Sequence, residues 1–202
     1  MSEIPAGRLV LRPIGRDAAR AVLEGGSPDG LTLAPGYPSR FSLEVMEMVA
    51  RSRPGAGGGP WFMVRRDDGA VVGEIGATVD GSTAQVGYTV VEPSWGHGYA
   101  TEALRALLGH LLADPGIDRV VAETLEGHAA NRRVMEKAGM RLHRRRVGEV
   151  DGEQAELVVY ELPAAPSGPG PALTPTPEQP SPHPQPSPPP PGMRGPRTGG
   201  SP

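Results

Sequence analysis

Alternation of apolar and polar residues predicts the strands of this chain. Residues 8–13, Arg-Leu-Val-Leu-Arg-Pro, alternate as the residues of a half-buried strand do. Three further strand-like runs follow closely at residues 61–65, 71–79 and 84–91, and an Asp-Gly pair separates each run from the next. Asp-Gly between strand-like runs is a strong hairpin signal. These three runs are therefore predicted to form an antiparallel meander.

Spacings of three and four residues between apolar side chains predict the helices. The clearest helix covers residues 100–112, and its apolar stripe consists of Ala103, Leu104, Leu107, Leu108 and Leu111. Residues 17–23 predict a short helix, and Ser42 is a plausible N-cap for a helix that continues to residue 53. A last helix is expected over residues 130–137.

The remaining pattern completes an α/β fold. Residues 119–124 predict a strand, and residues 140–150 and 155–161 predict a closing hairpin turned by Asp-Gly. The resulting order is β-α-α-β-β-β-α-β-α-β-β. Such an order predicts a mixed, mainly antiparallel sheet flanked by helices.

Composition changes sharply near residue 163. Residues 163–202 contain 16 of the 25 prolines and no aromatic residue. Such a segment cannot bury enough apolar surface to offset the entropy of ordering it. We therefore expect one folded domain over residues 1–162, followed by a disordered, proline-rich tail over residues 163–202.

Charge and residue usage exclude several classes of protein. The chain has 20 basic and 23 acidic residues, which argues against binding to the phosphates of a nucleic acid. It has no cysteine, so a thiol nucleophile and a cysteine-type zinc site are excluded. Its five histidines show no spacing typical of metal ligands. No apolar run is long enough to span a membrane, and no signal peptide is recognisable, so a cytoplasmic protein is expected.

Candidate chemistry lies where a strand leads through a glycine loop into the best helix. Gly96, His97 and Gly98 stand directly before that helix, and Thr101 adds a hydroxyl in its first turn. The first N–H groups of a helix have no internal partner, and the helix dipole makes that end positive. Glycines let an anion approach the backbone closely. The pattern predicts a site for a phosphate or pyrophosphate.

Three interpretations compete for this loop. It could simply be a turn that lets a helix begin. It could be a dinucleotide fingerprint of a nucleotide-dependent oxidoreductase, but Thr101 stands where the third glycine should be and antiparallel strands precede it. It could also hold the pyrophosphate of an acyl-CoA. The rest of the chain favours this third interpretation.

Five segments together resemble one protein family. They are Arg8-Leu-Val-Leu-Arg-Pro13, Gly73-Glu-Ile-Gly76, Val86-Gly-Tyr88, Trp95-Gly-His-Gly-Tyr-Ala-Thr-Glu-Ala103 and Ala130-Asn-Arg-Arg-Val-Met-Glu-Lys-Ala-Gly-Met140. In this order and at this spacing, the chain resembles the GNAT superfamily of N-acetyltransferases, and within it the RimJ/RimL branch. The resemblance covers about residues 7–162.

The resemblance implies acetyl-CoA as co-substrate and no metal. It implies that the strands at residues 84–91 and 119–124 splay apart, with the pantetheine arm paired to backbone near Val90 and Val91. The pyrophosphate would lie on the loop and first helical turn, and the implied contact residues there are Gly96, His97, Gly98, Tyr99, Ala100 and Thr101. The family often forms homodimers, so a homodimer is one arrangement to expect.

Several positions depart from the family pattern. Trp95 stands where the family has Arg or Gln, and His97 could either bond a phosphate oxygen or face solvent. His128 replaces a usual Asn, and Asn131 replaces a usual Ser but keeps a side-chain donor that could reach the pantetheine arm or the thioester of the cofactor. Asn131 could cap a helix only if the helix begins there. Gln85 stands where the family often has Glu, and an amide cannot act as a base.

The implied reaction is direct attack of a primary amine on the thioester of acetyl-CoA. The amine would belong to a protein N-terminus or to a small molecule. Glu74 is the candidate proton acceptor, with an ordered water as the alternative. Asn131 and Tyr88 are the candidates for assisting the leaving sulfur. Because of Gln85 and His128, the alternative of a catalytically inactive acyl-CoA-binding regulatory or interaction module stays open.

Overall fold

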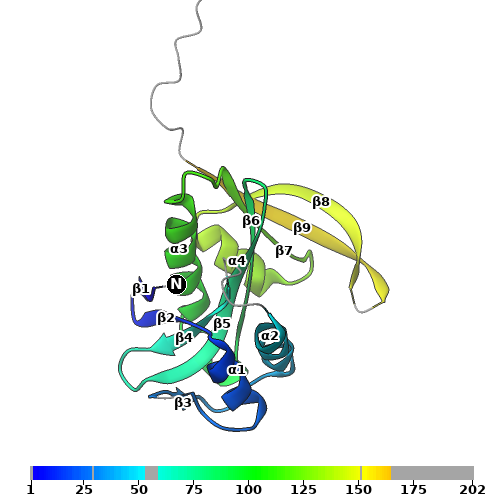
Figure 1. Ribbon diagram of the computed structural model, residues 1–202. Helices are drawn as coiled ribbons and strands as arrows, with labels where there is room; N and C mark the ends of the chain where they lie inside the picture. The colour runs from blue at the N-terminus through cyan, green and yellow to red at the C-terminus, as the bar shows by residue number, and fades with distance from the viewer. Residues whose placement is uncertain (1, 29, 53–58, 151, 165–202) are drawn as a thin grey trace, which may run out of the picture. The chain divides into compact units, whose positions relative to one another are not determined.

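A single mixed sheet forms the body of the protein in the computed structural model, which describes residues 2–28, 30–52, 59–150 and 152–164. The sheet order is β1-β2-β4-β5-β6-β7-β9-β8, and β3 pairs separately with β5 (Figure 1). Neighbours along this order are antiparallel except for the parallel pair β6–β7. The α/β fold with a mixed, mainly antiparallel sheet is therefore confirmed.

The strands follow the predicted runs with modest shifts. They are β1 (Ile4–Ala6), β2 (Leu9–Pro13), β3 (Thr32–Leu33), β4 (Trp61–Arg65), β5 (Ala70–Asp80), β6 (Thr83–Val90), β7 (Arg119–Leu125), β8 (Arg141–Val150) and β9 (Glu153–Pro163). Two short strands, β1 and β3, were not expected. Their three and two residues are too few for alternation to stand out from a loop.

The described residues form four α-helices beside the sheet, together with one short 3₁₀ turn. They are α1 (Arg16–Leu23), α2 (Arg40–Arg51), α3 (Tyr99–Leu112) and α4 (Ala129–Lys137), with the 3₁₀ turn η1 (Glu92–Ser94) between β6 and α3. The expected N-cap of α2 is wrong: Ser39 caps this helix by accepting from the N–H of Ser42. The hydroxyl of Ser42 in turn accepts a hydrogen bond from the N–H of Ser39, so the two serines form a capping box.

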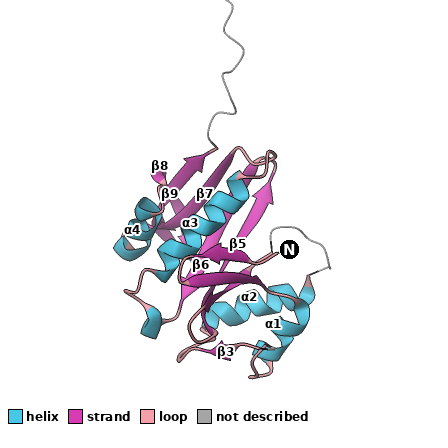
Figure 2. Ribbon diagram, turned by 90° about the vertical axis from the view of Figure 1, so that its left-hand side faces the viewer, coloured by secondary structure: helices cyan, strands magenta, loops and turns pink. Residues whose placement is uncertain are grey.

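The helices cover the two faces of the sheet, as consecutive residues of β4 demonstrate. Trp61 packs edge-on against His110 of α3, whereas Phe62 packs edge-on against Tyr37, just before α2. Successive strand side chains point to opposite faces, so α3 and α2 lie on opposite sides. Figure 2 shows α1 beside α2 and α4 beside α3. Both aromatic residues of β4 are buried, as core residues should be.

Gly73, a glycine of the Gly73-Glu-Ile-Gly76 segment, is required by the close approach of two strands. A Cβ atom there would lie 2.1 Å from the carbonyl oxygen of Thr89 on β6, a distance at which no side chain fits. Gly73 therefore lets β5 and β6 approach closely at the end of β6. The approach fixes the neighbouring Glu74 opposite Thr89 in the ladder.

The compact unit of the chain runs from Met1 to Ala165. The last strand ends at Pro163. The disordered tail expected over residues 163–202 lies outside the described residues from residue 165 onward.

Candidate active site

The glycine loop before α3 presents a run of backbone N–H groups. Gly96 and Gly98 have φ angles of 77° and 83°, in the left-handed region that favours glycine. None of the described residues accepts a hydrogen bond from the N–H groups of Gly96, His97, Gly98, Tyr99 or Ala100. Such a run at the positive end of a helix is suited to an anion.

The acidic charge in the first turn of α3 is paired with a cation. Thr101 and Glu102 both donate their N–H to the carbonyl of Gly98. The carboxylate of Glu102 accepts bonds from the backbone N–H and the guanidinium of Arg8, at 3.0 Å and 2.5 Å. Partial burial acts to raise the pKa of Glu102, but the bonds and charge of Arg8 outweigh it and hold that pKa below its usual value. Glu102 is thus neutralised, and its charge does not oppose an anion at the loop.

His97 is fixed by the loop itself. Its ring stacks on Tyr99 with 5.5 Å between centroids, and the Arg8 guanidinium lies 5.0 Å from the same tyrosine ring. The Nδ1 atom of His97 lies 2.9 Å from the carbonyl oxygen of Trp95 and 3.2 Å from that of Ser94. A donating Nδ1 leaves Nε2 as the ring atom able to meet a ligand.

The end of β6 is partly occupied by the chain's own groups. The indole N–H of Trp95 donates to the carbonyl of Val90 at 2.5 Å. The N–H of Val91 donates to Val72, and the carbonyl of Val91 accepts from Ser94. Both backbone groups of Val91 are therefore already bonded, and a ligand reaching this strand end would meet Val90 and Trp95 first.

Strands β6 and β7 separate at their carboxyl ends. Their parallel pairing covers only four residue pairs, and the last pair is Val86 with Ala122. β6 nevertheless continues to Val90 and β7 to Leu125, each paired on its other side. The splay expected from the sequence is present, and it leads from the middle of the sheet toward the glycine loop.

Three polar side chains meet beside this splay. The hydroxyl of Tyr88 on β6 lies 3.5 Å from the carbonyl oxygen of Asn131 on α4, at the outer limit of a hydrogen bond. The amide of Asn131 donates to the hydroxyl of the buried Thr124 on β7 at 3.3 Å. Burial raises the pKa of Tyr88, so its phenol keeps its proton. Asn131 does not cap α4, because His128 holds the N-cap position.

Glu74 lies in a buried polar group on the α2 side of the sheet. It is opposite Phe62 in the ladder and only 2% exposed, and neither carboxylate oxygen has a hydrogen-bond partner among the described residues. Burial raises the pKa of Glu74 to about 7; the hydroxyls of Ser42 and Tyr37 act in the opposite direction but lack good hydrogen-bond geometry to it. Glu74 can therefore change its protonation state near neutral pH.

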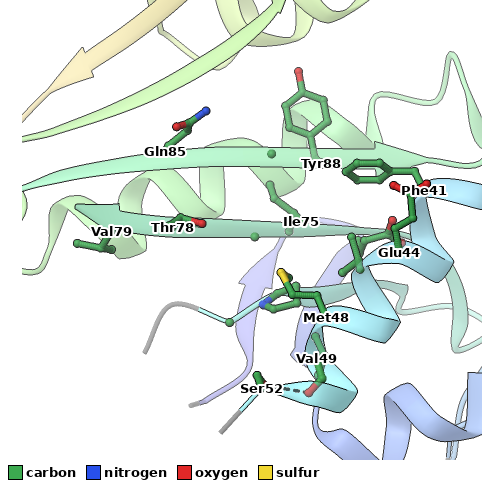
Figure 3. A pocket seen from close by; sticks show the side chains of 17 residues that line it. Phe41, Glu44, Met48, Val49, Ser52, Ile75, Thr78, Val79, Gln85 and Tyr88 are labelled. Atoms are coloured by element: carbon green, nitrogen blue, oxygen red, sulfur yellow. Dashed lines mark hydrogen bonds between the residues drawn. The ribbon is translucent and has the colours of Figure 1, made fainter. Parts of the chain in front are cut away.

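A cavity of about 600 Å³ lies between α2 and the β5–β6 ribbon (Figure 3). Its lining includes Glu74, Gly87 and Tyr88, so it reaches the strand that borders the splay. The helix contributes Phe41, Glu44, Val45, Met48 and Val49. The cavity and the glycine loop thus approach β6 from different sides, which suits two substrates that react side by side.

Four residues of this site were not anticipated from the sequence: Arg8, Tyr37, Ser42 in its buried role, and Thr124. Arg8, Tyr37 and Ser42 act on residues far away in the chain; Arg8 and Glu102, for example, are 94 residues apart. Thr124 bonds Asn131, which is seven residues away but belongs to the next element. The alternation around Arg8 predicted a strand but could not identify its partner. Thr124 lies at the end of a predicted strand, next to the expected splay, and that position was the available signal.

The described residues contain neither a metal-binding cluster nor a membrane-spanning helix. No three His, Asp or Glu residues lie close enough together there to hold a metal ion. In the same part of the chain, no helix has both the length and the apolar character needed to cross a bilayer.

A family comparison decides the identity of this arrangement. The family model described as "Acetyltransferase (GNAT) domain" matches residues 8–141, about two thirds of the chain. The chain belongs to the GNAT acetyltransferase family. It is therefore an acetyl-CoA-dependent acetyltransferase, which confirms the family and the general activity expected from the sequence.

Individual relatives agree with this assignment. "Uncharacterized N-acetyltransferase YoaA" from Bacillus subtilis is 26% identical over 139 residues, which cover 65% of this chain and 78% of the relative. A GNAT-family acetyltransferase from Bacillus anthracis has a similar fold, with a TM-score of 0.61 and 18% identity over 81% of this chain and 99% of that one. RimL, a ribosomal L7/L12 α-N-protein acetyltransferase solved with coenzyme A, has a TM-score of 0.60 and 17% identity to this chain. The match covers 80% of this chain and 98% of RimL.

Proposed function

We propose that this GNAT protein transfers the acetyl group of acetyl-CoA to a primary amine, of a protein N-terminus or of a small molecule, by direct attack. The observation that carries this proposal is the splay of β6 and β7 between an anion-binding loop and a separate cavity. The five matching segments further support a place in the RimJ/RimL branch.

The glycine loop fits the pyrophosphate of coenzyme A. Five consecutive N–H groups without acceptors among the described residues, from Gly96 to Ala100, would bind its oxygens, and a Cβ added at Gly96 would meet no other atom within 4 Å. Thr101 is 9% exposed, so its hydroxyl can contribute only where the ligand reaches the first turn. Val90 would be the backbone contact on β6. Its carbonyl would be available to the cofactor only when the indole N–H of Trp95 no longer bonds it.

Proton movements follow from the overall balance. The amine nitrogen forms a bond to the acetyl carbon while the carbon–sulfur bond breaks, and a starting ammonium loses two protons. One proton ends on the sulfur: the Tyr88 phenol is placed to supply it and then regains a proton from the nitrogen. The Tyr88 hydroxyl lies beside the carbonyl of Asn131, whose amide donates to Thr124. The other proton leaves toward Glu74. Because its carboxylate is buried, that proton would travel through a water or a neighbouring hydroxyl.

Release of free thiol from acetyl-CoA, measured with a panel of primary amines, tests the proposal. Glu74→Ala should lower the rate roughly a hundredfold while calorimetric CoA binding stays close to that of the wild type. Binding of CoA without turnover on any amine would contradict the proposal and favour an inactive acyl-CoA-binding module.

The loop is tested separately with matched glycine substitutions. Gly96→Ala and Gly152→Ala both place a side chain at positive φ, but only Gly96 belongs to the loop; Gly152 follows β8. Gly96→Ala should weaken CoA binding roughly tenfold or more, because the strain displaces the N–H groups. Equal CoA affinity in the two variants would remove the loop from the binding site.

A further inference from the structure

The cavity beside Glu74 has an apolar wall on the helix side. Figure 3 shows Phe41, Met48 and Val49 of α2 facing the β5–β6 ribbon across the cavity. Its volume of about 600 Å³ lies within the range typical of sites for small molecules. An acceptor that fills such a space must place hydrocarbon against α2.

Three large apolar side chains around this cavity are strongly exposed. Phe41 is 52% exposed, Met48 58% and Val79 46%, and all three line the same cavity. Single exposed apolar residues are ordinary, but several gathered at one hollow mark a place where an apolar surface is covered by a ligand. The body of the acceptor is therefore expected to be apolar.

Charge in the lining has one sign. Among the described residues that line the cavity, Glu44 and Glu74 are the only charged ones. Glu44 has a weak partner, Arg40, at 3.6 Å, and their side chains are 61% and 96% exposed. Glu44, together with Glu74 when it is ionised, attracts an ammonium group and repels a carboxylate or phosphate, and the described lining holds no cation.

The backbone around the cavity is poorly suited to a peptide. The cavity lies on the face of the β5–β6 ribbon, where residues from Ile75 to Val79 pair with residues from Tyr88 to Ala84. A bound peptide needs free backbone groups, usually at a sheet edge, for its own main chain. The wall formed by residues from Ile75 to Val79 offers a face instead of an edge. The unpaired side of β6 begins only after Val86, where the thioester arm is expected, so the cavity favours a small molecule over a protein N-terminus.

We propose that the acceptor is a small primary amine with an apolar body and no carboxylate. Its hydrocarbon would lie against Phe41 and Met48, and its ammonium would lie toward the carboxylates of Glu44 and Glu74. This inference rests on the proposed transferase function and narrows its substrate class.

A panel of four amines tests the class. 2-Phenylethylamine and phenylalanine differ by one carboxylate, spermidine carries several ammonium groups, and a hexapeptide with a free N-terminus represents a protein acceptor. The rate of thiol release with each amine gives kcat/KM, and the mass of each product identifies the acetylated amine. We expect 2-phenylethylamine to exceed the other three at least tenfold. Preference for the peptide, spermidine or phenylalanine would overturn the inference and leave the transferase function standing.

Variants of α2 locate the binding surface. Phe41→Ala should raise KM for 2-phenylethylamine about tenfold and leave KM for ethylamine and the affinity for CoA nearly unchanged. Met48→Ala should act in the same direction. Leu43→Ala is the matched control, because Leu43 is 36% exposed on the same helix but does not line the cavity. An unchanged KM in both lining variants would overturn the inference, and no transfer to any amine would overturn both proposals.

Discussion

Glu74 combines three properties that are seldom found together in a strand carboxylate. It is almost fully buried, its oxygens have no partner among the described residues, and its pKa is raised to about 7 by burial. A buried carboxylate without partners favours its neutral form, because no donor replaces the hydrogen bonds that water would give to the charged form. A fold that keeps such a group adjacent to a cavity retains it at a cost in stability, which is expected of a functional residue.

The first prediction concerns this cost. Because the pKa of Glu74 is higher in the folded protein than the ordinary value of 4.5, its stabilising effect is complete below about pH 4.5 and is lost as pH rises through about 7. Glu74→Gln removes this dependence. The free energy of unfolding of the wild type should therefore fall by about 3 kcal/mol relative to the Gln variant between about pH 4 and about pH 8. Urea unfolding across this range measures it, with the exposed Glu149→Gln as control, and parallel wild-type and Glu74→Gln curves would exclude the effect.

A second prediction separates Tyr88 from other buried tyrosines. Tyr88→Phe should lower kcat roughly tenfold to a hundredfold, because the phenol that keeps its proton is lost beside the splay, while the Kd for CoA changes little. Tyr160→Phe is the control, since the Tyr160 hydroxyl bonds Glu136 and Arg132 away from β6. Rapid-quench or steady-state thiol release gives kcat. A similar loss in both variants would indicate a general effect on folding.

Among elements, α2 both begins with a capping box and forms the apolar wall of the cavity. We expect Ser39→Ala to destabilise the protein by about 1 kcal/mol, because the N–H of Ser42 loses its acceptor. Thermal unfolding measures the change. Ser52→Ala at the other end of α2 is the comparison, since its hydroxyl donates to the carbonyl of Val49 and is not an N-cap. Equal losses at both ends would argue against the capping box.

The start of α3 is anchored by Arg8, which lies near the N-terminus, 94 residues before Glu102. Arg8→Ala leaves the bond from the residue-8 N–H to Glu102 but removes the guanidinium, so the Glu102 charge is no longer neutralised near the loop. The Kd for CoA should rise roughly threefold to tenfold at low salt, and less at high salt. Calorimetry at two ionic strengths measures it. Arg12→Ala on β2, which breaks an exposed pair with Glu3 just before β1, should leave the Kd unchanged.

Elements differ in how well local sequence predicts them. The helix now seen as α3 was predicted to within one residue, because its apolar stripe repeats over several turns. The N-cap of α2 was misplaced by three residues because Ser39 and Ser42 are both suitable caps, and only the bonds between them distinguish the roles. Strand β3 was missed because two residues cannot display a period.

At the scale of the whole molecule, the loop at residues 96–101 and the splay followed from contiguous motifs. The buried surroundings of Glu74 did not, because Tyr37 and Ser42 reach it from other segments, and burial depends on how α2 covers the sheet. The same holds for the cavity, whose apolar wall and acidic charge come from elements that the sequence pattern placed in order but not in contact. Tertiary packing decides these features, and local periodicity carries no information on it.

The last prediction concerns the extent of the folding unit. A chain that ends at Ala165 keeps every described strand, including the bond from the N–H of Ala164 to the carbonyl of Asp118 at 2.7 Å. Its thermal midpoint and its kcat/KM should therefore equal those of the full chain. A chain that ends at Gln154 loses β9, which lies between β7 and β8 and pairs with both, and it should not fold cooperatively. Lower stability of the chain ending at Ala165 would mean that the proline-rich segment contributes to the fold after all.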